Sequence, residues 1–513
     1  MKKIKFLFLS LFAGLTITGC STLEESPVGL LAPESFFTSV GDIQTSVNGA
    51  YGHMQHRYFM SREMSMSLML RSDMVDLNKN VSNPERVQFN DVALLTDNAN
   101  IEVYWPKAYQ IIGAANQAIA GAEFVTADAA TKNRVTAQAY FIRAFTYFHL
   151  VRQFGAIPYL TAPVTDIQAA STISKTPAAD VYAGIIADLK YAKEWLPNTQ
   201  VSRALPAKSA ASAFLADVYL TLGDYQNAYA EAKDIISKEG AYNLGLEADY
   251  QNIFDASKQD ASKELIFVID FIGQSNGDQG RNYQAAFTGI RADAQYGYGG
   301  GWSVSVPSLG VYNAWNGRDY RKSVSLDTTG VFGGKVQPYT EFTKFFAAGD
   351  NRPHIAKYTR KAGPAADGNG RTNGQNYIMM RYAEVLLIAA EALNEITPGS
   401  AEAAGYVNRV RARARAGAAG STPRTFPADV AGLDQNAFRT MVLEERKWEL
   451  AFEFKRWYDI ARRKLADGPN GVFSASGLEG AKSKFQSNRD YLFPLPANEL
   501  VRNANLAPQN AGY

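Results

Sequence analysis

The chain has 513 residues, of which 46% are hydrophobic, with 52 basic and 50 acidic side chains. This size and apolar content are sufficient for one large or two medium domains with a buried core. The near-balance of charge gives no indication of a nucleic-acid partner.

The first residues have the features of a secretory signal. Lysines at positions 2, 3 and 5 precede an apolar run from Phe6 to Ile17, which is too short to span a bilayer comfortably. Cys20 follows directly on Gly19 and is the only cysteine in the chain. We therefore predict that residues 1–19 are removed and that Cys20 is lipidated, with an ordinary signal peptide cleaved elsewhere as the alternative. No other long apolar run is present, so this lipid is the predicted membrane attachment.

The next part of the chain is predicted to be a tether followed by a helical scaffold. Residues 20–35 contain turn-forming and acidic residues without periodicity, which is typical of a linker. The scaffold is expected over about residues 36–240, with Pro106 near the first turn of its third helix. The apolar periodicity and the stop signals place its first helices at residues 40–56, 62–77, 101–120, 131–154 and 178–196.

A repeat signature follows at residues 207–238. Several residues fall where a tetratricopeptide repeat places its leucine, small residue, tyrosine, Gly-Asp-Tyr turn and packing alanine: Leu215, Ala216, Tyr219, Gly223, Asp224, Tyr225 and Ala228. One repeat cannot bury both of its faces alone, so other hairpins are expected, and residues 377–395 with 401–416 form the second candidate. The fold class is therefore predicted to be mainly α, a tetratricopeptide-like scaffold resumed at about residues 377–465.

A large irregular insertion with short β-strands is expected between the hairpins, at about residues 241–376. It is rich in glycine, and its clearest strand is at residues 264–271. Such insertions often carry function because loops vary without disturbing packing. An extended tail is predicted at about residues 485–513.

The insertion also contains a cluster of aromatic residues. Flat aromatic rings stack on the C–H faces of sugars, so the cluster indicates a ligand surface, and a local aromatic core is the alternative. The members of the cluster are Tyr283, Phe287, Tyr296, Tyr298, Trp302, Tyr312 and Trp315.

Residues 438–464 contain no proline or glycine and are predicted to form one uninterrupted, buried helix. Glu445, Glu449 and Glu453 would lie on one line of it, and buried carboxylates need cationic partners. We predict a structural ion-pair network, with acid–base catalysis as the alternative. The expected partners on the neighbouring hairpin are Arg381, Arg409 and Arg411.

The sequence contains no motif that indicates a cofactor or a metal. His53 and His56 form an HxxH pair, but no third ligand has convincing spacing for zinc. No P-loop, dinucleotide fingerprint or G-x-S-x-G motif is present. We therefore expect neither a cofactor nor a metal site.

Five segments resemble motifs of the SusD/RagB family of outer-membrane nutrient-binding lipoproteins from Bacteroidetes, and together they span most of the chain. One of these segments departs from the family pattern, because it has Phe454-Lys455 where a Gly-His or similar pair is common in the family. The segments are YWPKAYQIIGAANQAI, RAFTYFHLVRQFGAIPYL, RYAEVLLIAAEALNE, ERKWELAFEFKRWYDIARR and YLFPLPANEL, the last followed by the ending PQNAGY.

The resemblance implies a single SusD-like domain over residues 36–513, without catalysis, anchored at the cell surface in the outer membrane. It implies a lid over a SusC-like TonB-dependent transporter that captures oligosaccharides and delivers them to the pore. The alternatives are a scaffold that binds peptides or the transporter without sugar recognition, or a secreted glycoside hydrolase. Trp105 lies in a scaffold motif and is expected in the core.

The resemblance also implies that the site combines the insertion with loops near the early helices, which adds three polar residues to the insertion's aromatic residues. The candidate glycan-binding residues are Trp302, Trp315, Tyr296, Tyr298, Tyr283, Asp73, Arg71 and Asn78.

Overall fold

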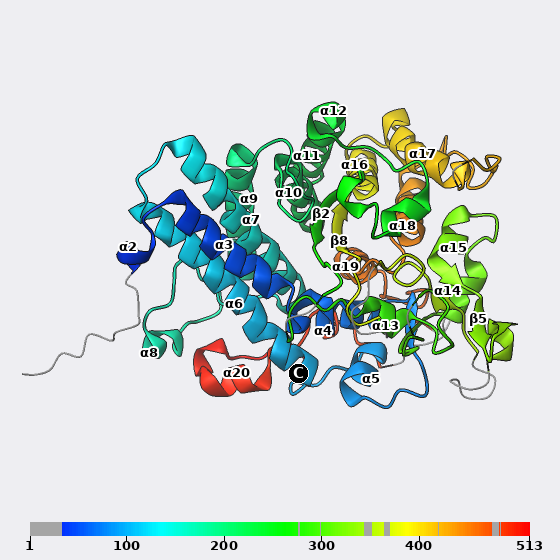
Figure 1. Cartoon of the computed structure of the whole chain (residues 1–513), viewed down its shortest axis with the longest axis horizontal. Coiled ribbons are helices and arrows are strands. Elements are labelled where there is room, and N and C mark those ends of the chain that lie inside the picture. The colour runs from blue at the N-terminus through cyan, green and yellow to red at the C-terminus, as the bar shows by residue number, and fades with distance from the viewer. Residues whose placement is uncertain are drawn as a thin grey trace, which may run out of the picture.

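The computed structural model describes residues 33–274, 277–297, 299–342, 351–363, 370–418, 420–474, 482 and 484–513. The predicted signal segment, Cys20 and nearly all of the predicted tether lie outside these residues. The chain is mainly helical, as predicted, with short strands (Figure 1). The α-helices are α2 (Pro33–Phe36), α3 (Val40–Met54), α4 (Glu63–Leu70), α5 (Pro84–Asn90), α6 (Ala99–Gly121), α7 (Ala129–Phe154), α8 (Ile167–Ala170), α9 (Ala178–Trp195), α10 (Lys208–Leu222), α11 (Tyr225–Ser237), α12 (Glu239–Tyr242), α13 (Gln284–Thr288), α14 (Leu309–Ala314), α15 (Tyr320–Ser325), α16 (Tyr382–Ile396), α17 (Ala401–Ala416), α18 (Gln435–Glu449), α19 (Arg456–Arg463) and α20 (Ala497–Arg502).

The scaffold is a stack of helix pairs: α3 with α6, α7 with α9, α10 with α11, and α16 with α17. Each pair packs on the next, through α6 on α7, α9 on α10 and α11 on α16, and the stack runs across the molecule in Figure 1. The predicted repeat at residues 207–238 is confirmed as α10 and α11. Gly223 ends α10 with a φ of 75°, and the Asp224 carboxylate caps α11 by accepting from the amide of Asn227.

Two predictions about the early helices are wrong. The expected second helix at residues 62–77 shortens to α4 and continues into a strand, and the long partner of α3 is α6. Pro106 lies in the interior of α6, about two turns from its start. The reason is that Asn98 caps the helix by accepting from the amide of Asn100, so α6 begins earlier than the apolar pattern indicates.

The strands form two-stranded antiparallel sheets in the part of the chain that the structure describes. Two of these sheets join the insertion to the scaffold. The β1–β3 sheet places Val75 opposite Pro307, and the β2–β8 sheet ends with Leu265 opposite Arg381. The strands are β1 (Val75–Leu77), β2 (Leu265–Ile269), β3 (Ser305–Pro307), β4 (Leu326–Asp327), β5 (Thr329–Phe332), β6 (Lys335–Pro338), β7 (His354–Ile355) and β8 (Tyr377–Arg381).

The predicted uninterrupted helix over residues 438–464 is also wrong. It divides into α18 and α19, and Phe452 and Phe454 in the connecting turn have φ values of 66° and 65°. Such values are costly for bulky residues, so tertiary contacts must hold them. The Phe452 carbonyl accepts from the Tyr358 hydroxyl at 2.6 Å, and the Phe454 ring stacks on Tyr358 and packs on Tyr377. Helix propensity is overridden by this packing.

The predicted ion-pair network is present, although the glutamates do not share one helix. Glu449 accepts from Arg381 at 2.5 Å and from Arg321 at 3.0 Å, and it also pairs with Arg413. Glu453 lies in the turn and pairs with Arg381 at 2.8 Å. These groups are buried, so the network lies inside the protein and clamps α18 against α17 and β8.

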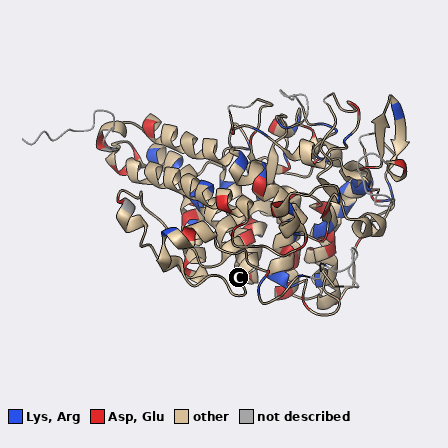
Figure 2. Cartoon of the chain, turned by 90° about the horizontal axis from the view of Figure 1, so that it is seen from below, with Lys and Arg blue, Asp and Glu red and all other residues tan. Residues whose placement is uncertain are grey.

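The predicted partners have different outcomes. Arg381 is confirmed, and so is Arg411, which pairs with Glu445 at 2.7 Å. The prediction for Arg409 is wrong, because this residue pairs with Glu239 at 2.7 Å. Three further cations of the network were not anticipated: Arg321, Arg413 and Lys357. Basic and acidic residues are interspersed over the fold (Figure 2), in keeping with the balanced composition.

Acid should destabilise the fold through this network. Burial alone would raise the pKa of Glu449, but Arg413, Arg381 and Arg321 outweigh it and hold the pKa below the ordinary value of 4.5. Arginine and lysine partners lower the pKa of Glu453 in the same way. The unfolded chain therefore binds protons first, and the stabilisation present above pH 4.5 is lost as the pH falls through the folded-state pKa values.

We expect the free energy of unfolding in urea to decrease between about pH 5 and pH 3. The buried Glu264 opposes part of this trend, because burial raises its pKa. A free energy of unfolding that is equal at both pH values would contradict the prediction. Fluorescence and circular dichroism should be followed together to confirm a single transition.

Candidate functional site

The three candidate residues from the early loops are buried and bound to other parts of the fold. The Asp73 carboxylate accepts two bonds of 2.8 Å from Arg456. The Arg71 guanidinium is fully buried, with its carbon 4.7 Å from the centre of the Trp457 ring. The Asn78 amide donates to the Ser303 carbonyl at 2.9 Å. In this structure these contacts join α4 and β1 to the insertion and to α19.

Two of the candidate aromatic residues are also internal. The Trp315 side chain is only 2% exposed, and its ring stacks on Trp448 with centroids 5.0 Å apart. Its indole N–H donates to Asp319 at 3.3 Å. Tyr283 is 3% exposed. Both faces of a buried ring are covered by protein, so neither residue presents a stacking platform here.

Tyr296 and Tyr298 have separate outcomes. Tyr296 is half-buried, and its hydroxyl accepts from the Gln295 amide at 2.8 Å. Burial, with a smaller contribution from Asp327, raises the pKa of Tyr296 to about 12, so this residue acts as a neutral phenol at physiological pH. Tyr298 lies outside the described residues.

Trp302 is the tryptophan of the insertion that reaches the surface. It is half-buried, and its ring packs edge-on against Phe287 at 5.5 Å and lies 6.2 Å from Tyr283. The backbone amide of Trp302 donates to the carbonyl of Ala286 at 2.6 Å, which fixes the residue against α13. The amide of Tyr283 donates to Ser61 at 3.3 Å and so ties α13 to the scaffold. Trp302 therefore sits on a rigid base.

Four arginines surround these rings. The Arg62 guanidinium lies 5.2 Å from the centre of the Tyr283 ring, and Arg86 lies 5.1 Å from the centre of Phe287. Arg281 donates to the Tyr283 hydroxyl at 3.5 Å. We call this cluster the arginine–aromatic patch; its partly exposed members are Arg57, Arg62, Arg86, Arg281 and Trp302, and Tyr283 and Phe287 form the buried base beneath them.

The patch draws on segments that are far apart in the sequence. Arg57 begins the short helix at residues 57–61 and Arg62 directly follows it, Arg86 lies on α5, and the other members lie in the insertion. The arginines before the insertion were missed by sequence reasoning. No local motif marks them, because they meet only when the amide of Arg57 bonds to Asp278 and Tyr283 bonds to Ser61.

The patch has more cations than close carboxylates. Arg57 pairs with Asp278 at 3.1 Å, and Arg62 pairs with Glu63 at 3.0 Å. In the described part of the chain, Arg86 and Arg281 have no carboxylate within ion-pair distance. Burial lowers the pKa of Arg86, and the charge of nearby Arg62 lowers it further.

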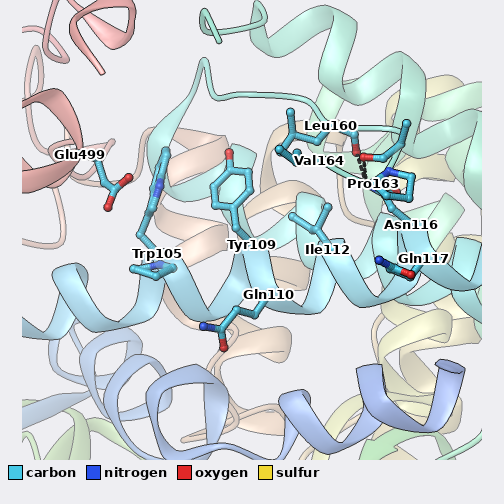
Figure 3. Close-up of a pocket in the computed structure, with 13 residues that line it drawn as sticks. Trp105, Tyr109, Gln110, Ile112, Asn116, Gln117, Leu160, Pro163, Val164 and Glu499 are labelled. Atoms are coloured by element: carbon cyan, nitrogen blue, oxygen red, sulfur yellow. Dashed lines mark hydrogen bonds between the residues drawn. The ribbon is translucent and has the colours of Figure 1, made fainter. Parts of the chain in front are cut away.

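A second surface feature is a groove of about 500 Å³ along α6 (Figure 3). Its lining groups are largely apolar, and its main polar groups are already engaged. The Tyr109 hydroxyl donates to Pro158 at 2.8 Å, and the Asn116 amide donates to Leu160 and Ala162 at 3.0 and 3.2 Å. Trp105 lines the groove but is 3% exposed, which confirms its expected place in the core. The groove offers few free polar groups to orient a hydrophilic ligand.

Two kinds of feature are absent from the described residues. No helix among them is both long and apolar enough to cross a bilayer. No group of three or more His, Cys, Asp or Glu side chains among them is arranged to hold a metal ion.

Comparison with known proteins identifies the family. Residues 339–513 match the model of the SusD family, and residues 31–220 match the model described as starch-binding associating with outer membrane. SusD-like protein P2 of Formosa agariphila is 53% identical over the full length of both chains.

Solved structures share the fold. A SusD homologue from Bacteroides thetaiotaomicron superposes with a TM-score of 0.80 at 20% identity, covering 94% of this chain and 98% of that one. A laminarin-binding SusD-like protein gives a TM-score of 0.76 at 22% identity, covering 93% and 100%. The full-length identity with protein P2, together with the two family matches, shows that this chain belongs to the SusD family of outer-membrane-associated proteins.

Proposed function

We propose that this protein is a non-catalytic, cell-surface lipoprotein that binds oligosaccharides and delivers them to a SusC-like TonB-dependent transporter in the outer membrane. Membership of the SusD family supports this role, and so does the structural likeness to a protein that binds laminarin. The lipid would be carried by Cys20. The observation that carries the proposal is Trp302, a half-exposed indole held on a rigid aromatic base.

The geometry around Trp302 suits sugar binding in three respects. An indole face stacks on the apolar C–H face of a sugar ring. The base of Phe287 and Tyr283 fixes the ring before a ligand arrives, which lowers the entropy cost of binding. The surrounding arginines supply hydrogen-bond donors for sugar oxygens. Binding of this shallow kind is suited to capture followed by release.

The hydrolase alternative finds no support in the glutamate series. Glu449 and Glu453 are buried and paired with arginine, so a polysaccharide does not reach them. A general acid at neutral pH needs a raised pKa, whereas the arginines hold both of these pKa values low. The network is explained by its structural role.

Substitution of Trp302 tests the proposal. We expect Trp302→Ala to weaken glycan binding about tenfold or more, because a central aromatic anchor is lost. Trp302→Phe, which keeps a smaller ring, should retain part of the affinity. Binding would be measured by affinity electrophoresis and calorimetry over a panel of soluble polysaccharides, with thermal unfolding to verify the fold.

Trp195→Ala is the matched control, because Trp195 is also half-buried but ends α9 in the scaffold. It should bind the panel as the wild type does. Equal binding by wild type and Trp302→Ala would refute the site. Release of reducing sugar by the purified protein would refute the non-catalytic role.

A further inference from the structure

We infer that the ligand of the arginine–aromatic patch is an anionic glycan, one that carries sulfate esters or uronate carboxylates. The inference rests on the proposed function, since it names the chemical class of the glycan. Its basis is the position of three guanidinium groups, those of Arg62, Arg86 and Arg281, against the Tyr283 and Phe287 rings on which Trp302 packs. Sulfate and carboxylate present the same feature to the protein, a group of oxygens sharing negative charge.

The unpaired state of Arg86 distinguishes this patch from the other arginine clusters of the fold. In the interior network Arg381, Arg321 and Arg413 each contact two or more carboxylates within 3.0 Å. Arg86 is half-buried and packs on Phe287, but no carboxylate of the described residues lies within ion-pair distance of it. The arginines of the interior network are thus neutralised by direct ion pairs, whereas Arg86 has only the more distant charges of Glu63 and Glu85, which leaves its guanidinium able to bind an external anion.

Arg62 strengthens the argument because its charge repels that of Arg86. Its one close carboxylate is Glu63, which is buried beneath the surface at 5% exposure. The Arg62 side chain is 25% exposed, and its Nε atom is buried without a hydrogen-bond partner. An oxyanion beside these two guanidiniums would relieve their mutual repulsion, and charge-assisted hydrogen bonds to such a group are stronger than neutral ones.

Arg281 extends the same arrangement on the insertion side. Its hydrogen bond to the Tyr283 hydroxyl is long, at 3.5 Å, and its Nε atom has no hydrogen-bond partner among the described residues. The hydroxyls of a neutral sugar donate as well as accept, so they are best matched by sites that also supply acceptors such as amide or carboxylate oxygens, yet the nearby Asn282 is buried and donates to the carbonyl of Gln375. The free groups of the patch are therefore mainly cationic donors, and an acceptor-rich anionic ligand complements them.

Matched pairs of polymers test the inference. Dextran and dextran sulfate share one backbone, as do methyl-esterified and free polygalacturonate, so each pair isolates one kind of anionic group. We expect dextran sulfate, polygalacturonate or both to bind at least tenfold more tightly than the neutral partner, and added salt to weaken that binding. Which acid binds identifies the source of the charge.

Arginine variants locate the effect. Arg86→Ala should weaken binding of the charged polymer about tenfold, and it should weaken binding of the neutral polymer less, so that the preference for the charged polymer decreases. Arg86→Lys keeps the charge but loses the fork, so it should fall between the two. Arg281→Ala provides a second variant if Arg86→Ala does not fold. Arg134→Ala is the control, because this exposed arginine of α7 removes the same charge outside the patch.

The inference fails if neither charged polymer binds better than its neutral partner, or if Arg134→Ala weakens binding as much as Arg86→Ala. In the first case, binding of neutral glycans that depends on Trp302 would leave the proposed function standing. If no polymer of either kind binds, the proposed function fails and this inference fails with it.

Discussion

Glu449→Ala should lower the free energy of unfolding by about 3–5 kcal/mol, because it breaks a buried ion-pair network by removing one member. The Glu449 carboxylate is fully buried and contacts Arg381, Arg413 and Arg321. Its removal leaves three guanidiniums inside the protein with fewer counter-charges, while Glu264, Glu445 and Glu453 remain to satisfy them in part. The cost is the desolvation of cations that have lost a partner.

Glu444→Ala is the matched control, since Glu444 lies on the same helix with its side chain 48% exposed, 3.5 Å from Lys447. This change should alter the free energy by less than about 1 kcal/mol. Urea unfolding of the two variants measures the difference. Glycan binding by the folded fraction of Glu449→Ala should equal that of the wild type. A loss for Glu449→Ala no larger than that for Glu444→Ala would show that the network contributes little to stability.

Trp315→Ala should destabilise the protein by about 3–5 kcal/mol, the usual cost of removing a buried tryptophan. The side chain is 2% exposed and stacks on Trp448, and its removal leaves a cavity and removes one hydrogen bond to Asp319, whose carboxylate keeps its pairing with Arg321. We expect no change in glycan affinity per folded molecule. This pattern is the reverse of the one expected for Trp302→Ala, so the two tryptophans separate stability from binding.

A double-mutant cycle with Trp448→Ala measures the stacking energy directly. The ring pair should show a coupling energy of about 0.5–1.5 kcal/mol. Thermal and urea unfolding supply the stabilities, and affinity electrophoresis on the glycan that binds the wild type supplies the affinities. Reduced affinity in Trp315→Ala without loss of stability would show that this side chain meets the ligand after all.

The scaffold was largely predictable from sequence because its signals are local. Helix periodicity and the Gly-Asp turn at Gly223 each fall within one helix or hairpin, and the glutamates at four-residue spacing already indicate that cationic partners are needed. The break between α18 and α19 was not predictable, because it depends on Phe452 and Phe454 meeting residues near position 358, about a hundred positions away. Local sequence patterns contain no information about contacts between residues so far apart.

The candidate site was harder to predict for the same reason. The sequence around an aromatic residue in a glycine-rich loop does not show whether its ring is covered or partly exposed. Trp315 is covered by Trp448, whereas Trp302 is partly exposed. Arg62 and Arg86 carry no motif and reach the patch only through the folded backbone. Composition indicated the region, but tertiary contacts decide which side chains face a ligand.

The burial of Arg71 has a consequence for the order in which the molecule can be completed. Its guanidinium lies between Trp457 and Phe493 and donates to the carbonyl of Asp490, more than four hundred residues further along the chain. Nearby, the Asn510 amide donates to the carbonyl of Phe154 at 2.8 Å. The first part of the core therefore stays open until the last residues arrive. A chain exported from its N-terminal end would close this part of the core only after its final segment has crossed the membrane.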